Sequence, residues 1–143
     1  MLLHVTEPGP GLEEVRALLR EYWRSFGFTP CFQGFDEELE SLPGGYALFL
    51  EPGAGCVAVR GLSADTAEMK RLYVRPRARG TGLGRTLAMK AIDYAREQGY
   101  RRLLLDTIAD KMPQAVALYR SLGFRETAPY NDTPGALWME LRL

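Results

Sequence analysis

A basic, glycine-rich stretch over residues 79–85 carries the clearest chemical signal in the sequence. It reads Arg-Gly-Thr-Gly-Leu-Gly-Arg, with a glycine at every second position. Glycine allows a loop to take positive φ values and leaves backbone N–H groups free to point at one anion. A helix predicted to begin near Leu83 adds the positive end of its dipole at the same place. The spacing therefore predicts a pyrophosphate-binding loop formed by Arg79, Gly80, Thr81, Gly82, Leu83, Gly84 and Arg85.

Two common nucleotide-binding loops do not fit this spacing. A Walker A loop needs Gly-x-x-x-x-Gly-Lys-Ser/Thr, but Arg85 stands at the lysine position and Arg79 at the first glycine. A dinucleotide-binding fingerprint needs a third glycine at position 85, which is arginine. The stretch is therefore a phosphate loop of another kind.

The elements around the loop follow from the hydrophobic pattern. A strand over 69–74 is stopped by Pro76, and the helix after the loop has an apolar stripe that ends at Gly99. Further strands are predicted over 2–6, 46–50, 56–62, 102–107, 124–128 and 137–141, and further helices over 12–26, 36–42 and from Pro113 to Gly123. The order β-α-α-β-β-β-α-β-α-β-β predicts an α/β (α+β) fold in which about seven strands form a mixed sheet with helices on both faces.

Composition limits the classes of function. The 143 residues, 46% of them hydrophobic, predict one domain over residues 1–143. The formal net charge of zero argues against nucleic acid as a partner, since the basic cluster is local. The two cysteines, Cys31 and Cys56, have no metal-ligand spacing and favour a reduced, cytoplasmic setting without a metal. No apolar run approaches the length of a membrane span.

Two motifs together resemble the GNAT superfamily of N-acyltransferases. One is the order strand, Val-x-Pro, Arg-Gly-x-Gly-x-Gly, helix, and the other is the stretch Leu-Tyr-Arg-Ser-Leu-Gly-Phe over 118–124. The resemblance covers almost the whole chain and is strongest over 66–124. Segments 67–74 and 129–135 also resemble a bacterial subgroup whose acceptors are unassigned. The resemblance implies a mostly antiparallel sheet that is splayed at its central strands.

The resemblance also implies an activity. Family members hold the pantetheine arm of acetyl-CoA along the strand before the loop, which here is the backbone of Leu72, Tyr73 and Val74. We therefore expect transfer of an acetyl group from acetyl-CoA to a primary amine of a small molecule or peptide, by direct attack in a ternary complex. The alternative is a non-catalytic acyl-CoA-binding or regulatory module on the same fold. The expected partners are acetyl-CoA and an amine, without nucleic acid or membrane, and a homodimer is possible.

The resemblance assigns two proton-transfer roles. Glu68 matches the carboxylate that takes the acceptor's proton, directly or through water, although a solvent-facing glutamate at a strand end would look the same. Tyr119 matches the general acid for the departing thiolate, with a core tyrosine as the alternative. Many relatives carry asparagine seven residues before this tyrosine, where it bonds the pantetheine. This chain has Met112 there.

The acceptor side is predicted less sharply. Asp106 ends a buried strand, where it is placed either to meet substrate or to cap the structure that follows. Glu37, Glu38 and Glu40 are either attractors for a cationic amine or a solvated helix face. The family places its acceptor wall at the first helices, where aromatic residues gather, so Tyr22 and Phe32 are candidate acceptor contacts.

Overall fold

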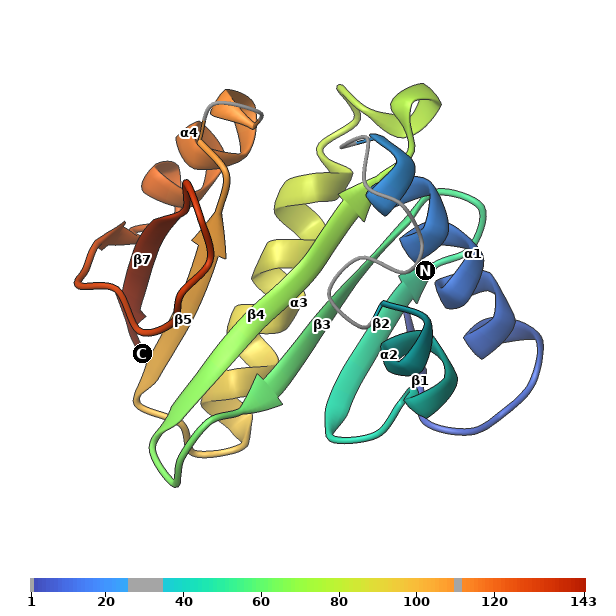
Figure 1. The fold of residues 1–143 in the computed structure, drawn as a ribbon, viewed down its shortest axis with the longest axis horizontal. Coiled ribbons are helices and arrows are strands. Elements are labelled where there is room, and N and C mark those ends of the chain that lie inside the picture. The colour runs from blue at the N-terminus through green and yellow to red at the C-terminus, as the bar shows by residue number, and fades with distance from the viewer. Residues whose placement is uncertain (1, 26–34, 110–111) are drawn as a thin grey trace.

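The computed structural model describes residues 2–25, 35–109 and 112–143 (Figure 1). The sheet has seven strands in the order β1-β2-β3-β4-β5-β7-β6. The strands are β1 (Leu3–Val5), β2 (Tyr46–Glu51), β3 (Gly55–Gly61), β4 (Thr66–Val74), β5 (Arg102–Thr107), β6 (Arg125–Glu126) and β7 (Leu137–Arg142). All neighbours pair antiparallel except β4 and β5, which are parallel. The predicted mixed, mostly antiparallel sheet is confirmed.

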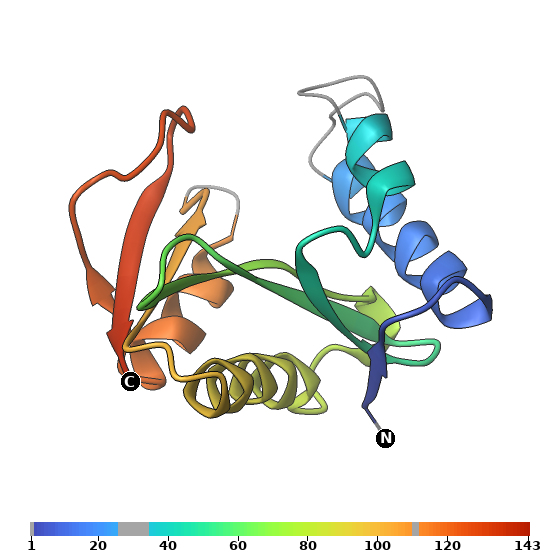
Figure 2. The ribbon, with the colours of Figure 1, turned by 90° about the horizontal axis from the view of Figure 1, so that it is seen from below.

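Helices cover both faces of the sheet. Figure 2 shows α3 (Leu83–Glu97) beneath the sheet, and α1 (Pro10–Ser25) with α2 (Phe35–Ser41) on the opposite face. The alternation along β2 explains this layering, because Phe49 joins the core under α3 while Leu48 and Leu50 join the core under α1. The fourth helix, α4 (Pro113–Ser121), follows β5 and precedes the short β6.

The two parallel strands separate soon after they begin. Pairing between β4 and β5 is confined to Thr66 with Arg102, Ala67 with Leu103 and Glu68 with Leu104. Beyond these pairs the strands diverge towards the end of β4 (Figure 1). The expected splay is therefore present, and it leaves the second half of β4 without a ladder to β5.

A β-bulge reshapes β4 at the same point. Cys56 of β3 pairs with Tyr73 and Ala58 pairs with Lys70, so Arg71 and Leu72 together face one residue of β3. Arg71 has a φ of 61°, which is unusual for a residue with a side chain. The extra residue shifts the side-chain alternation of β4 by one position.

Two predicted strand limits are wrong. β4 begins at Thr66 rather than Met69, because its first residues form the ladder with β5 and β3. The predicted strand over 124–128 is reduced to Arg125 and Glu126. Thr127 still donates its N–H to the Trp138 carbonyl, but Pro129 has no N–H with which to continue the ladder.

Candidate active site

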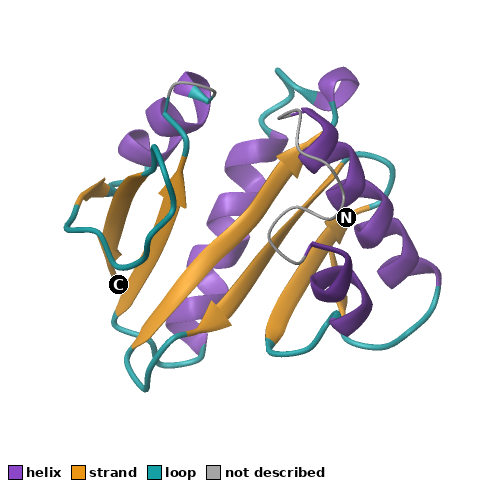
Figure 3. Cartoon of the chain, viewed as in Figure 1, coloured by secondary structure: helices purple, strands orange, loops and turns teal. Residues whose placement is uncertain are grey.

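The glycine-rich loop takes the conformation that its sequence predicts. After β4, a single 3-10 turn, η2 (Pro76–Ala78), leads into the loop at the carboxyl end of the strand (Figure 3). Gly80 and Gly82 have φ values of 81° and 85°. Gly82 is the N-cap of α3 and makes no side-chain cap, so the first N–H groups of the helix stay available to an anion.

A cavity of about 600 Å³ extends from this loop along β4 to α4. Its walls are the end of β4, the start of α3, the end of α1 and one side of α4. The lining residues are Tyr22, Ser25, Leu72, Tyr73, Val74, Arg79, Gly84, Met112, Pro113, Gln114, Ala115, Leu118 and Tyr119. The cavity therefore joins the phosphate loop to the unpaired half of β4, which is the path that a pantetheine arm would need.

A second, smaller cavity of about 40 Å³ adjoins the first on the acceptor side. It is lined by Tyr22, Met69, Lys70, Arg71, Leu72, Leu105, Asp106, Thr107, Met112 and Tyr119. Four of these residues, Tyr22, Leu72, Met112 and Tyr119, line both cavities. This shared boundary is the place where two reactants, one in each cavity, would meet.

Tyr119 lies at that boundary, on α4. Tyr119 is only 6% exposed. Its ring packs edge-on against the ring of Phe124, with the two ring centroids 5.8 Å apart. Burial raises the pKa of its hydroxyl above the ordinary value, with Tyr22 and Asp106 adding to the effect. The hydroxyl is therefore protonated at neutral pH and able to donate. Tyr22 faces it from α1, and burial raises the pKa of Tyr22 to about 12.

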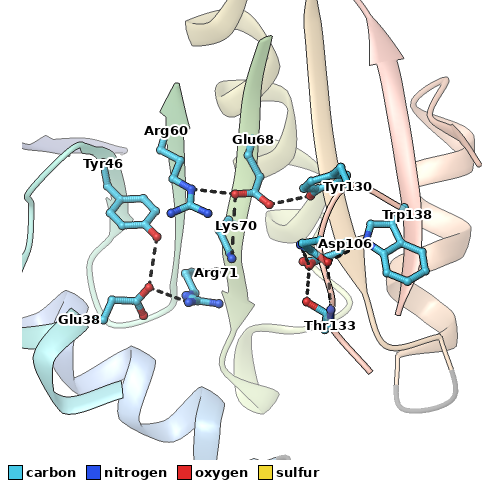
Figure 4. Close-up of polar contacts among 11 residues, drawn as sticks. Glu38, Tyr46, Arg60, Glu68, Lys70, Arg71, Asp106, Tyr130, Thr133 and Trp138 are labelled. Carbon is cyan, nitrogen blue, oxygen red and sulfur yellow. Dashed lines mark hydrogen bonds and ion pairs between the residues drawn. The ribbon is translucent and has the colours of Figure 1, made fainter. Parts of the chain in front are cut away.

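Glu68 is the centre of a buried polar network rather than a solvent-facing strand end (Figure 4). Its side chain is 0% exposed, and its Oε1 accepts a hydrogen bond from Arg60 Nε at 2.8 Å. Its Oε2 accepts one from the Tyr130 hydroxyl at 2.6 Å. Lys70 Nζ lies 4.0 Å from Oε1. Glu68 lines neither cavity, and it connects β3, β4 and the segment after β6.

Asp106 is held by the segment between β6 and β7 (Figure 4). Its Oδ2 accepts hydrogen bonds from Asn131 Nδ2 at 2.7 Å and from Thr133 Oγ1 at 3.0 Å. The Oδ1 of Asn131 accepts from Trp138 Nε1 at 2.8 Å, which fixes the segment to β7. These hydrogen bonds therefore hold the Asp106 side chain in the wall of the smaller cavity, instead of in the capping role that its sequence position also allowed.

The arginines that cluster in the sequence separate in space. Arg75 makes a forked ion pair with Glu21 of α1, with Nη2 to Oε2 at 2.8 Å. Arg79 donates from Nε to the Val74 carbonyl at 2.9 Å and lines the large cavity, whereas Arg77 reaches the Gly53 carbonyl at 3.4 Å. Arg71, a few residues earlier in the sequence, has its side chain on the face of the sheet that α1 and α2 cover, paired with Glu38 at 2.7 Å.

The structure brings together most of the predicted site. Leu72, Tyr73, Val74, Arg79, Gly84, Tyr119, Tyr22 and Asp106 all line one or both cavities. Met112 lies at the boundary of the two cavities, and Gln114 supplies a polar side chain to the large one. The candidate Phe32 falls outside the described residues.

Sequence reasoning missed the cations of the acceptor side. Lys70 and Arg71 line the small cavity, and Glu38 of α2 is the glutamate that turns inward, whereas Glu37 and Glu40 are exposed. The only signal in the sequence was two adjacent basic residues inside an apolar strand.

Cys56 is buried in the core, as its apolar neighbours predict, and burial raises the pKa of its thiol to about 12. Among the residues that the structure describes, no group of three or more potential metal ligands comes together. In the same part of the chain, none of the helices has the length and apolar character needed to cross a membrane.

Comparison with known proteins identifies the family. Residues 12–124 match the acetyltransferase (GNAT) family. An uncharacterised N-acetyltransferase of Schizosaccharomyces pombe is 39% identical over 92% of this chain and 88% of its own length. An acetyltransferase from Streptococcus agalactiae has the same fold, with a TM-score of 0.82 at 17% identity over 100% of this chain and 98% of that one. A GNAT acetyltransferase from Elizabethkingia anophelis, solved with acetyl-CoA bound, gives a TM-score of 0.72 at 20% identity over 100% and 97%.

The chain belongs to the GNAT acetyltransferase family. The predicted class, an acyl-CoA-dependent N-acyltransferase, is therefore confirmed, and acetyl-CoA is the cosubstrate that this class uses. The residues present fit that cosubstrate, because the loop offers backbone N–H groups to a pyrophosphate and the large cavity follows an unpaired strand edge.

Proposed function

We propose that the protein transfers the acetyl group of acetyl-CoA to the primary amine of a small molecule or peptide by direct attack within a ternary complex. The supporting observation is the pair of adjoining cavities that share Tyr22, Leu72, Met112 and Tyr119. One cavity suits the cosubstrate and the other has a carboxylate in its wall for an amine. The Elizabethkingia acetyltransferase, which has the same fold, was solved with acetyl-CoA bound, and this supports acetyl-CoA as the cosubstrate.

In this proposal the amine nitrogen attacks the thioester carbonyl, the carbon–sulfur bond breaks, and the amine loses a proton as the thiolate gains one. Backbone N–H groups of β4 at Leu72 to Val74 stabilise the oxyanion. The hydroxyl of Tyr119 donates to the departing sulfur. Asp106, in the wall of the small cavity, meets the incoming ammonium. Glu68, which lines neither cavity, takes the proton of that ammonium through water.

The proton step has a definite energetic requirement. An amine with a pKa near 10 is almost fully protonated at neutral pH, and its deprotonation costs about 4 kcal/mol. A carboxylate in the cavity wall attracts the ammonium but raises its pKa, so it does not by itself lower this cost. The proton must therefore pass to a base before the nitrogen can attack.

The alternative, a non-catalytic acyl-CoA-binding or regulatory module, is favoured by one observation. Met112 stands where the family resemblance implies a pantetheine-bonding asparagine, and a methionine side chain cannot make that hydrogen bond. Binding of acetyl-CoA without turnover would follow from this alternative.

The proposed acetyltransferase is further proposed to be cytoplasmic and to form a homodimer.

The test is release of free CoA thiol from acetyl-CoA in the presence of a panel of primary amines. The panel contains amino acids, amino acid amides, polyamines and peptides with free N-termini. We expect at least one amine to raise thiol release well above the amine-free background, with the acetylated amine detected by mass spectrometry. Tight calorimetric binding of acetyl-CoA with background release for every amine would instead establish the non-catalytic module.

A further inference from the structure

We propose that the acceptor is a small amino acid whose carboxylate binds Lys70, with Arg71 beside it, while its amino group lies at Asp106. This inference names the substrate class and rests on the proposed acetyl transfer. It comes from the small cavity, whose walls carry two cations and one carboxylate close together (Figure 4).

Lys70 is a largely buried cation without a close partner among the described residues. Its side chain is 15% exposed, and its ion pair with Glu68 spans 4.0 Å. The two oxygens of Glu68 are already engaged by Arg60 at 2.8 Å and by Tyr130 at 2.6 Å. The charge of Glu68 is thus balanced mainly by Arg60, which leaves the ammonium of Lys70 to be met by something that enters the cavity.

Arg71 adds a second cation to the same cavity. Its Nη2 bonds Glu38 at 2.7 Å and its guanidinium lies 4.5 Å from the centre of the Trp23 ring. Its Nε is buried and has no hydrogen-bond partner in the part of the chain that the structure describes, and the same holds for Oε2 of Glu38. Because Glu38, the partner of Arg71, would repel an anion, we place the carboxylate of the acceptor at Lys70, with Arg71 as a more distant second cation.

Asp106 forms the opposite wall and selects the amine. Both hydrogen bonds that Asn131 and Thr133 make to it reach Oδ2. Within the described residues no hydrogen bond reaches the other oxygen, Oδ1, which can therefore accept from an ammonium. Acetylation converts that ammonium into a neutral amide, so the product loses its attraction to Asp106 and leaves the site.

The size of the cavity fixes how far apart the two groups of the acceptor are. About 40 Å³ is roughly three times the volume of about 10–15 Å³ that a cavity needs, by the same measure, to hold one water molecule. Only the head group of an acceptor fits there, with its amine and carboxylate on the same or neighbouring carbons. This is the geometry of an α- or β-amino acid, and it disfavours a polyamine or a long ω-amino acid.

The electrostatics of the small cavity agree with this assignment. Burial lowers the pKa of Lys70 below its ordinary value, and Arg71 lowers it further, while Glu68 and Asp106 oppose the shift. Arg60 acts in the same direction as Arg71. A carboxylate from the acceptor would offset both the lost hydration and the repulsion between the two cations.

The experiment compares matched acceptors and matched variants. The acceptors are leucine, phenylalanine, aspartate and β-alanine, each tested with its carboxamide and its decarboxylated amine, together with O-phosphoethanolamine. The test variant is Lys70→Met. The control variant is Lys90→Met, because Lys90 is a lysine of α3 whose ammonium lies over the ring of Phe49 and lines neither cavity. Thiol release from acetyl-CoA gives kcat/KM for each combination.

We expect at least one free acid to exceed its amide tenfold or more in kcat/KM, and Lys70→Met to remove that preference while Lys90→Met keeps it. Lys70→Met should also keep or raise the thermal midpoint, because a largely buried ammonium is replaced by an apolar chain of similar length. A parent enzyme that uses acids and amides equally, or prefers amides or O-phosphoethanolamine, would overturn the inference. So would a Lys70→Met variant that melts earlier but keeps the acid preference.

A binding measurement separates this inference from the proposed function. N-acetylated amino acids and their amides are titrated into the complex with CoA, which requires no turnover. Preferential binding of the acid, lost in Lys70→Met, would support the carboxylate site even if no amine released thiol. Equal binding of acid and amide would overturn the site even if acetyl transfer were established.

Discussion

Tyr119, which lines both cavities, is the residue that the family resemblance proposes as the general acid. We expect Tyr119→Phe to lower kcat about 10- to 100-fold while the affinity for CoA is unchanged. The effect is moderate for two reasons. A CoA thiolate leaves acceptably without help, and the raised pKa of this tyrosine makes full proton transfer uphill. Steady-state kinetics and calorimetric titration of CoA provide the measurement.

A matched control separates chemistry from packing at this residue. Tyr94→Phe removes a hydroxyl from α3 at a ring that packs on Phe49 and lines neither cavity. It should leave kcat unchanged. If Tyr119→Phe loses thermal stability but turns over normally, Tyr119 is a core residue and the assignment of an acid is wrong.

Glu68 remains a predicted route for the acceptor's proton. Glu68→Gln keeps the side-chain volume but removes the charge that Arg60 and Tyr130 engage. We expect turnover at neutral pH to fall tenfold or more, with partial recovery as pH rises and free amine accumulates. A pH–rate profile measures this. A loss that is the same at every pH would show that Glu68 only positions its neighbours.

For single residues, the sequence predicted the element on which a side chain lies better than it predicted the neighbours that the side chain contacts. Tyr119 and Asp106 both line the small cavity, because each lies in an element whose position the local sequence signals predict. The burial of Glu68 was not predictable, since its partners Arg60 and Tyr130 come from 8 residues before it and 62 residues after it. Lys70 and Arg71 were missed because simple alternation sends neighbours to opposite faces, and the bulge brings both to one cavity.

Among the elements, the junction of the glycine-rich loop and α3 gives the sharpest test of cosubstrate binding. Gly82 has a φ of 85° and open space where a Cβ atom would lie, so charge and backbone strain, not collision, decide the effect of a substitution. Gly82→Asp and Gly82→Asn have similar shapes, and both tolerate this conformation better than other residues. We expect the aspartate variant to bind CoA at least tenfold more weakly than the asparagine variant.

Calorimetric titration of CoA into both variants measures this difference. The asparagine variant serves as the control because it carries the same backbone cost without the negative charge. Equal affinities for the two would mean that the pyrophosphate lies away from the start of α3. The loop would then be a turn without a role in binding.

Element order was predictable because each helix and strand carries a local signal, such as Gly99 and Gly123 after the ends of α3 and α4. The splay and the bulge were different. Both depend on how many residues of β4 pair with its neighbouring strands, which no local sequence signal reports. The splay was predicted only from the family resemblance. The short β6 shows the limit of periodicity, since an alternating pattern over 124–128 cannot report that Pro129 ends the ladder.

For the molecule as a whole, α1 is docked to β4 by an ion pair as well as by apolar contacts. Arg75 donates to both oxygens of Glu21, and the Tyr73 hydroxyl bonds the same carboxylate at 3.3 Å. The hydrogen bonds from Arg75 hold the pKa of Glu21 below its ordinary value of 4.5. The stabilisation is therefore complete above that value and is lost as pH falls through the lower, folded-state value.

Glu21→Gln should lower the thermal midpoint by about 1–3 °C near pH 7, because the pair is partly exposed and such pairs contribute at most about 1 kcal/mol. The difference from the parent should shrink as the pH falls from 4.5 through the lower, folded-state pKa, because the parent's carboxylate then becomes protonated. Thermal melts across this range provide the check. A difference that stays constant with pH would mean that packing, and not the ion pair, is lost.

The divergence of β4 from β5 has a further consequence for how the protein avoids unwanted assembly. A strand with an unused row of N–H and C=O groups normally lies at the rim of a sheet, where it invites pairing with another chain. Here the part of β4 beyond Glu68 has no ladder to β5, yet it lies in the middle of the sheet, between two strands that stay paired at one end. The edge of another folded sheet cannot enter that space, but a single extended chain with amide groups can. The geometry that would admit a pantetheine arm in the proposed function thus also keeps out the edge of a second protein molecule.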